Sequence, residues 1–191
     1  MKQGLVVEHF DVKGKNGEKL RVVFRYPSKQ DVTAAVKMVN MVRDETDFLG
    51  QRHHETIKTE RLFIETQIRN MRKRKGLCLF VEVNGKLAGD SVIRSLEFDF
   101  SSHVGRLGIM IEEQFTGLGI GTRLVQKMLE LAKKQTMFKV IGSSVVSKNV
   151  RSRKLQKKFG FKQYGLFPKE ILLRDGTYCD HVYLYKVIKE L

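Results

Sequence analysis

The stretch 111-IEEQFTGLGIGTRLVQKML-129 places three glycines at alternate positions immediately before an amphipathic pattern. After the glycines, apolar residues recur at helical spacing: Ile120, Leu124, Met128, Leu131 and Ala132. This periodicity predicts a helix that begins near Gly119 and packs its apolar stripe on a sheet. The first turn of a helix offers backbone N–H groups without intrahelical partners, together with the positive end of the helix dipole.

These glycines are open to two interpretations. A phosphate or pyrophosphate fits at such a helix start, and glycine lets the backbone approach its oxygens without a Cβ in the way. Alternatively, the glycines form a tight strand-to-helix turn and serve only close packing. Two common phosphate motifs are excluded, because the chain has no G-x-x-x-x-G-K-[ST] and the glycine spacing is not G-x-G-x-x-G. The pattern therefore favours neither an NTPase nor a dinucleotide enzyme.

The rest of the chain alternates between strand and helix patterns. Strands are expected at 5–13, 20–26, 77–83, 86–97, 103–112, 139–146, 162–173 and 179–188, and helices at 31–43, 59–75, 119–135 and 150–159. Asn16-Gly17, Asn84-Gly85 and Asp175-Gly176 mark hairpin connections. This order predicts a three-layer α/β/α fold with a central mixed, mostly antiparallel sheet. We expect a single domain over 1–191, with an N-terminal hairpin extension over about 1–19.

Charge and composition restrict the class of protein. The 191 residues include 36 Lys plus Arg against 21 Asp plus Glu, a net charge of +15 that attracts polyanions. The basic residues cluster at 72-RKRK-75, at Lys133 and Lys134, and over 148–158, which on helices are most often solvated faces. No apolar run is long enough to span a bilayer and the N-terminus does not resemble a signal peptide, so no membrane association and a cytoplasmic location are expected.

Cysteine and histidine positions give no metal signal. Cys78 and Cys179 lie far apart in apolar strand-like contexts and are expected to be buried free thiols. His53 and His54 are adjacent, so they point apart on any regular element and make a poor chelating pair. No metal site is expected.

Two spaced motifs carry a resemblance to a known family. Gln114-x-x-Gly117-x-Gly119, continued by Ile120-Gly121-x-x-Leu124, resembles the acyl-coenzyme A signature of the GNAT superfamily of N-acetyltransferases. Downstream, 149-NVRSRKLQKKFGF-161 is similar to that family's N-x-x-[AS]-x-x-L-x-x-x-x-G-F segment. The order of elements fits from about residue 20 to the C-terminus, so the resemblance implies an acyl-CoA N-acyltransferase-like fold.

The resemblance implies acetyl-CoA as co-substrate. The strand before the glycines would splay from its neighbour and expose backbone groups to pantetheine, the glycine turn would wrap the pyrophosphate, and lysines would suit the remaining phosphate. The implied cofactor-binding residues are Ile109, Ile111, Gln114, Thr116, Gly117, Leu118, Gly119, Ile120, Gly121, Thr122, Asn149, Ser152, Lys154 and Lys157.

Three departures from the family pattern affect the chemistry. Thr116 stands where many relatives carry Arg, Gln156 where a tyrosine often protonates the leaving thiolate, and Ser144 where peptide N-terminal acetyltransferases often place an acid. Candidates for proton transfer are then Glu97, His103 and Glu112 as bases and Tyr164 as a relocated acid. The plainer alternatives are exposed strand-end carboxylates for Glu97 and Glu112 and a surface histidine for His103.

The resemblance thus implies an N-acetyltransferase that passes the acetyl group of acetyl-CoA to a primary amine by direct attack in a ternary complex. No G-x-S-x-G elbow or cysteine–histidine arrangement suggests a covalent intermediate. The acceptor is a small-molecule or peptide amine, nucleic acid is not favoured as a partner, and the chain is expected to be a monomer or homodimer. The alternatives are a catalytically weak acyl-CoA-binding regulatory protein and a basic nucleic-acid-binding module on the same fold.

Overall fold

The computed structural model describes residues 2–95 and 99–190. In this part of the chain there are eight strands and four α-helices, in the predicted order. They are β1 (Val6–Lys13), β2 (Lys19–Arg25), α1 (Val32–Glu45), α2 (Ile57–Arg72), β3 (Gly76–Val83), β4 (Lys86–Ser95), β5 (Val104–Ile111), α3 (Ile120–Gln135), β6 (Val140–Val146), α4 (Val150–Lys158), β7 (Lys162–Leu172) and β8 (Tyr178–Val187). None of these helices is long and apolar enough to cross a membrane.

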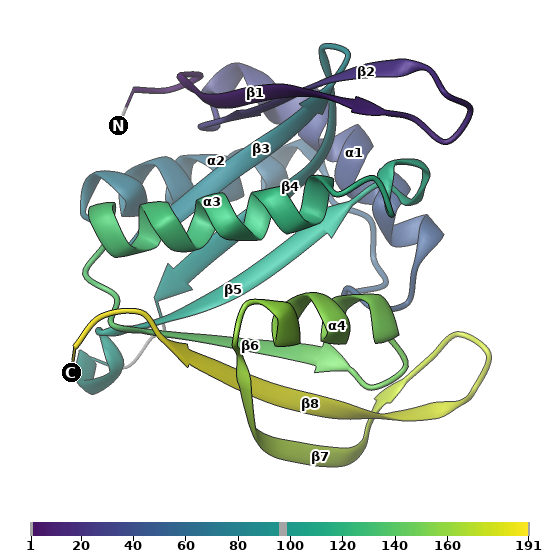
Figure 1. Ribbon diagram of the computed structural model, residues 1–191, viewed down its shortest axis with the longest axis vertical. Helices are drawn as coiled ribbons and strands as arrows, with labels where there is room; N and C mark the ends of the chain where they lie inside the picture. The colour runs from purple at the N-terminus through teal and green to yellow at the C-terminus, as the bar shows by residue number, and fades with distance from the viewer. Residues whose placement is uncertain (1, 96–98, 191) are drawn as a thin grey trace.

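The described strands form one sheet in the order β1-β2-β3-β4-β5-β6-β8-β7. All neighbouring strands are antiparallel except β5 and β6, which run parallel. In Figure 1, α3 and α4 lie in front of the sheet, whereas α1 and α2 lie behind it. The prediction of three layers around a mixed, mostly antiparallel sheet is confirmed.

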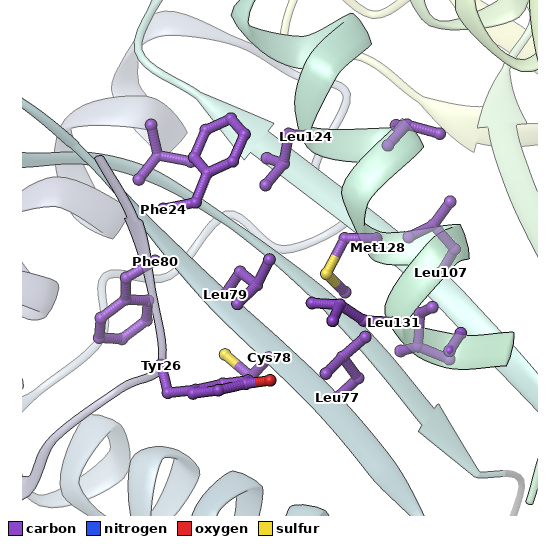
Figure 2. Close-up of a cluster of buried hydrophobic side chains, with 14 of the residues drawn as sticks. Phe24, Tyr26, Leu77, Cys78, Leu79, Phe80, Leu107, Leu124, Met128 and Leu131 are labelled. Atoms are coloured by element: carbon purple, nitrogen blue, oxygen red, sulfur yellow. The ribbon is translucent and has the colours of Figure 1, made fainter. Parts of the chain in front are cut away.

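The core lies where α3 packs on the middle of the sheet. Every member of the predicted stripe of α3 is buried, and Figure 2 shows Leu124 beside Phe24 of β2 and Leu131 beside Leu77 of β3. Full burial of a leucine or methionine side chain contributes about 1.5–3 kcal/mol, so this contact holds α3 firmly. Because α3 begins at the glycine turn, the same packing fixes the position of that turn.

Two local features differ from the sequence expectation. The first helix runs from Val32 to Glu45 rather than over 31–43, and Asp31 precedes it without capping it; the Asp31 carboxylate accepts the Ser28 N–H at 2.6 Å and pairs with the Arg25 guanidinium at 2.8 Å. The second helix begins at Ile57, where Thr56 caps it, and ends at Arg72, so the connection to α1 spans only residues 46–56. Capping oxygens at Ser28 and Thr56 are short-range signals that the apolar periodicity alone does not reveal.

The N-terminal hairpin is part of the sheet. β1 pairs with β2 from Val6↔Arg25 to Lys13↔Lys19, and β2 in turn pairs with β3. The Phe10 and Phe24 rings meet edge to face with centroids 5.2 Å apart. The first strand therefore lies at one edge of the sheet, within reach of the start of α3.

Candidate active site

The β5 and β6 strands separate along their length. Only three residue pairs join them, from Val104↔Val140 to Arg106↔Gly142, while β5 stays paired with β4 as far as Ile111. Figure 1 shows the two strands close at their starts and apart at their arrowheads. Beyond Arg106, the edge of β5 that faces β6 has no strand partner among the described residues. The resemblance implied this opening, which exposes the backbone around Ile109 and Ile111.

Side chains bridge the closed end of the opening. Ser143 Oγ of β6 donates to the Leu107 carbonyl of β5 at 3.3 Å and accepts from Gln156 Nε2 of α4 at 2.6 Å. Gln156 is only 5% exposed, and its Oε1 has no hydrogen-bond partner among the described residues. A buried polar atom without a partner costs about 1–3 kcal/mol. A bound molecule with an N–H or S–H group at this position would remove that cost.

The glycine turn connects the end of β5 to α3. Gly117 and Gly119 both have φ of +83°, in the left-handed region that glycine adopts without strain. No heavy atom of the described residues lies within 4 Å of a Cβ built at either position, so close packing does not explain these two glycines. At Gly121 a Cβ would make ordinary contacts, the nearest being Ile111 Cδ1 at 3.5 Å.

The backbone at this turn forms a row of free donors. The N–H groups of residues 118–122 donate to no acceptor among the described residues. They lie at the N-terminus of α3, whose N-cap is Gly119 and which has no side-chain cap. Free N–H groups, a positive helix end and open space beyond the glycines together suit an anion such as a pyrophosphate.

Glu113 links the glycine turn to α4 and to α1. Its carboxylate makes two hydrogen bonds of 3.1 Å with the Arg151 guanidinium of α4, which lowers the pKa of Glu113. Its carbonyl accepts the Thr116 hydroxyl at 2.7 Å, and its N–H donates to Glu45 of α1 at 2.8 Å. The link to Arg151 brings the start of α4 beside the turn, so the two motifs of the sequence meet in space.

The start of α4 carries the second predicted motif. Asn149 Oδ1 accepts the Ser152 N–H at 3.0 Å and thereby caps the helix, which leaves the Asn149 amide nitrogen for another partner. Lys154 and Lys157 are exposed on the same helix. The Arg151–Glu113 link places the start of this helix, with Asn149 and Ser152, beside the glycine turn.

A groove beside the turn adds residues that sequence reasoning missed. It has a volume of about 470 Å³ and is lined by Glu8, Gly119, Thr122, Arg123, Gln126, Lys127, Glu130 and Lys158. Glu8 of β1 pairs with Arg123 and, at 3.1 Å, with Lys127. The helical spacing of Arg123 and Lys127 could have indicated a basic face, but no sequence signal places Glu8 or Lys158 there.

The predicted proton-transfer residues do not lie together in one place. Glu112 is buried, which corrects the expectation of an exposed strand-end carboxylate; burial raises its pKa, and its carboxylate accepts Gln114 Nε2 at 2.7 Å. His103 is exposed at the start of β5, a strand length of about 25 Å from the glycine turn. Tyr164 is 59% exposed on β7, the outermost strand. Glu97 lies outside the described residues.

Comparisons with known proteins agree with this geometry. The model of the acetyltransferase (GNAT) domain matches residues 21–162. An acetyltransferase of the GNAT family from Streptococcus pneumoniae has a TM-score of 0.80 at 23% identity, covering 87% of this chain and 99% of that one. A putative acetyltransferase from Salmonella typhimurium, solved with its cofactor acetyl-CoA, has a TM-score of 0.79 at 18% identity over 89% and 95% of the two chains.

A third solved structure is the ribosomal-protein-alanine N-acetyltransferase from Brucella melitensis, with a TM-score of 0.76 at 19% identity over 86% of this chain and 98% of that chain. The search of curated protein sequences finds no match. The structural likenesses show the shared fold, and the domain match covers well over half of the sequence. The chain belongs to the GNAT acetyltransferase family.

Proposed function

We propose that this protein is an N-acetyltransferase that transfers the acetyl group of acetyl-CoA to a primary amine by direct attack in a ternary complex. The observation that carries this proposal is the row of free N–H groups at residues 118–122, which borders the opening between β5 and β6. Every helix start leaves such donors; what distinguishes this one is that Gly117 and Gly119 precede it with no heavy atom of the described residues within 4 Å of a Cβ at either position. We treat residues 1–191 as one functional domain.

Each part of acetyl-CoA has a complementary part of the site. The pyrophosphate would bind the free N–H groups of the turn, and the remaining phosphate would lie near Lys154, Lys157 or Lys158 at the groove. The pantetheine arm would run along the unpaired edge of β5, beside Asn149 and the unpartnered Gln156 Oε1. Both the N–H and the hydroxyl of Thr116 donate to the Glu113 carbonyl, so Thr116 offers neither of these donors to the cofactor.

The proposed reaction needs no enzyme nucleophile. The acceptor nitrogen attacks the thioester carbonyl, a C–N bond forms, the C–S bond breaks, and the amine proton is transferred away. Cys78 and Cys179 are both buried, and burial raises the pKa of the Cys78 thiol well above its usual range. A reactive thiolate needs exposure and a lowered pKa, so neither cysteine suits an acyl-enzyme intermediate.

Two of the similar structures suggest an acceptor class. The Brucella protein is named for the acetylation of a ribosomal protein alanine, and another, at 15% identity, is named for ribosomal protein L7/L12. These names support a peptide amine as the acceptor, with a small-molecule amine as the alternative. The net charge of +15 further favours an amine carried by an anionic molecule.

Thiol release from acetyl-CoA tests the proposal. The full chain would be mixed with acetyl-CoA and a panel of amines that includes a polyamine, an amino acid, an aminoglycoside and an alanine-terminated peptide. We expect amine-dependent release of the thiol and an acetylated product by mass spectrometry. Binding of acetyl-CoA without turnover of any amine would instead favour the regulatory acyl-CoA-binding role.

A further inference from the structure

A hydrogen-bonded group of three side chains lies on the β7–β8 hairpin. The Tyr183 hydroxyl is 2.9 and 2.7 Å from the two carboxylate oxygens of Glu170, and His181 Nδ1 is 2.9 Å from Glu170 Oε2. His181 and Tyr183 alternate along β8 and share one face, with ring centroids 5.0 Å apart. A carboxylate at Nδ1 holds a proton there, so the neutral imidazole presents Nε2 as a free acceptor.

An irregularity in β7 brings Glu170 to this position. Between Phe167↔His181 and Ile171↔Cys179 the register shifts, so that three residues of β7 face only Asp180 of β8. Lys169 within this bulge has φ of +55°, and its N–H donates to Asp180 Oδ1 at 3.0 Å. Bulges are known to redirect side chains at functional sites, and this one sets the glutamate against the histidine.

Strand register shows which face the group occupies. Ser143 points toward α4, because it is hydrogen-bonded to Gln156, so Ser144 points to the opposite face. Tyr183 pairs directly with Ser144, and His181 pairs with Val146, so both share the face of Ser144. Figure 1 draws no helix behind β6, β8 and β7 on that side. The group is therefore reached from the face opposite the glycine turn and α4.

The same register places the group at the open end of the β5–β6 gap. Ser144 and Val146 both lie beyond Gly142, the last β6 residue that pairs with β5. Directly opposed residues in antiparallel strands have Cα atoms about 4.5–5.5 Å apart, so His181 and Tyr183 lie one strand from the gap. The side chains of His181 and Glu170 are 20% and 33% exposed, which leaves them partly desolvated yet accessible.

We propose that His181, oriented by Glu170, is the general base that takes the proton from the acceptor amine. This inference rests on the proposed acetyl transfer and supplies the base that Ser144 and Gln156 cannot provide. As the C–N bond forms, the amine proton passes to His181 Nε2; as the C–S bond breaks, the thiolate leaves and takes up a proton from His181 or from water. Glu170 is a positioning residue that also stabilises the imidazolium.

Several charged or titratable groups surround the imidazole and bear on its pH response. Glu170 faces it from β7 and Tyr183 lies beside it on β8. Tyr164 of β7 approaches Tyr183 with ring centroids 6.2 Å apart, and the Arg106 guanidinium of β5 acts on Tyr183 by its charge. Bonding to Glu170 is the main cause that raises the pKa of Tyr183, so this phenol stays protonated near neutral pH.

The test compares His181→Asn and Glu170→Gln with His9→Asn, a matched control at an exposed position of the edge strand β1. Asparagine keeps a hydrogen-bond donor for Glu170 but cannot act as a base. With the amine that the wild type turns over best, we expect His181→Asn to lower kcat by about 10²- to 10⁴-fold and to abolish the acidic limb of the kcat–pH profile. Acetyl-CoA affinity should stay within about threefold, because the cofactor binds on the other face.

Glu170→Gln keeps the shape of the positioning residue but removes its charge. It provides a second test if the His181→Asn variant folds poorly. We expect it to lower kcat by about tenfold and to move the acidic limb, while His9→Asn changes neither. An unaltered kcat and pH profile in folded His181→Asn or Glu170→Gln would overturn the role of His181 and leave acetyl transfer standing. Wild-type protein that binds acetyl-CoA but acetylates no amine would overturn the proposed function, and this inference with it.

Discussion

The two faces of the β5–β6 opening present different chemical groups. On the face of α3 and α4, the candidate site consists mainly of backbone N–H groups from five consecutive residues, 118–122. On the opposite face, it consists of the side chains Glu170, His181 and Tyr183, brought together by strand register. Backbone N–H groups can bind phosphate whatever side chains surround them, whereas a hydrogen-bonded group of side chains depends on residue identity. Under the proposed function, the first face would bind the cofactor and the second would receive the acceptor.

The largest expected effect would come from placing a negative charge in the cradle. Asp and Asn both tolerate the left-handed backbone of Gly119, so Gly119→Asp and Gly119→Asn differ mainly in charge. We expect calorimetric titration to show acetyl-CoA affinity at least about 100-fold weaker for the aspartate variant, because like charges repel strongly in a partly desolvated site. The asparagine variant should lose less than about tenfold. Equal acetyl-CoA affinities of the two variants would show that the phosphates do not bind at this turn.

The second prediction concerns a buried carboxyl group, in contrast to Glu170, whose partly exposed carboxylate is hydrogen-bonded to His181 and Tyr183. Asp90 of β4 is 3% exposed, and burial, with a smaller contribution from Glu60, raises its pKa from 3.8 to about 7. The folded state therefore holds a proton that the unfolded state releases, so this group makes stability fall as pH rises from about 4 to 7. Well above pH 7 the carboxyl is ionised in both states, so it no longer changes the free energy of unfolding with pH.

Asp90→Asn removes that dependence. We compare the free energies of unfolding of the variant and the wild type. Their difference should shift in favour of the variant by about 2 kcal/mol between pH 5 and pH 7, because one proton contributes at most about 1.4 kcal/mol per pH unit. The difference should then stay level to pH 8. Urea unfolding at each pH measures it, with Asp11→Asn at the exposed pair with Lys19 as the surface control. A stability difference that does not vary with pH would show that Asp90 ionises normally.

The smallest effect concerns Gln156, which with Ser143 bridges the closed end of the β5–β6 opening on the α4 face. Gln156→Leu removes the unpartnered Oε1 and one hydrogen bond to Ser143, while Ser143 keeps its bond to Leu107. If the amide oxygen accepts a hydrogen bond from the cofactor, acetyl-CoA affinity should fall by about three- to tenfold. Gln163→Leu, an exposed change on β7, is the control for added hydrophobicity. An affinity that matches the wild type would make Gln156 a purely structural residue.

Sequence patterns anticipated α3 and the turn before it for a physical reason. The apolar stripe of a helix and a glycine turn are each set by residues close together in the chain, as the burial of Leu124 shows. The cap at Asn149 was not predicted, because Asn149 was expected from the resemblance only as a cofactor contact. The opening between β5 and β6 followed from the family resemblance rather than from periodicity.

The proposed acceptor side could not be anticipated in the same way. Glu170 reaches His181 only because the bulge around Pro168 and Lys169 shifts the register, and alternation along a strand gives no sign of such a shift. Likewise, Glu8 meets Arg123 and Lys127 across 115 residues or more, through the docking of β1 at the sheet edge. His103 looked suitable by residue type, but the length of β5 separates it from the glycine turn.

The most direct test of the central claim is one calorimetric comparison of acetyl-CoA and duplex DNA, each titrated into the wild-type protein at physiological salt. If the glycine turn and the β5–β6 opening hold acetyl-CoA, its dissociation constant should be in the range of about 1–100 μM, with no comparable affinity for DNA. Absence of acetyl-CoA binding, together with tight DNA binding that weakens steeply with added salt, would contradict the account and favour a basic nucleic-acid-binding module.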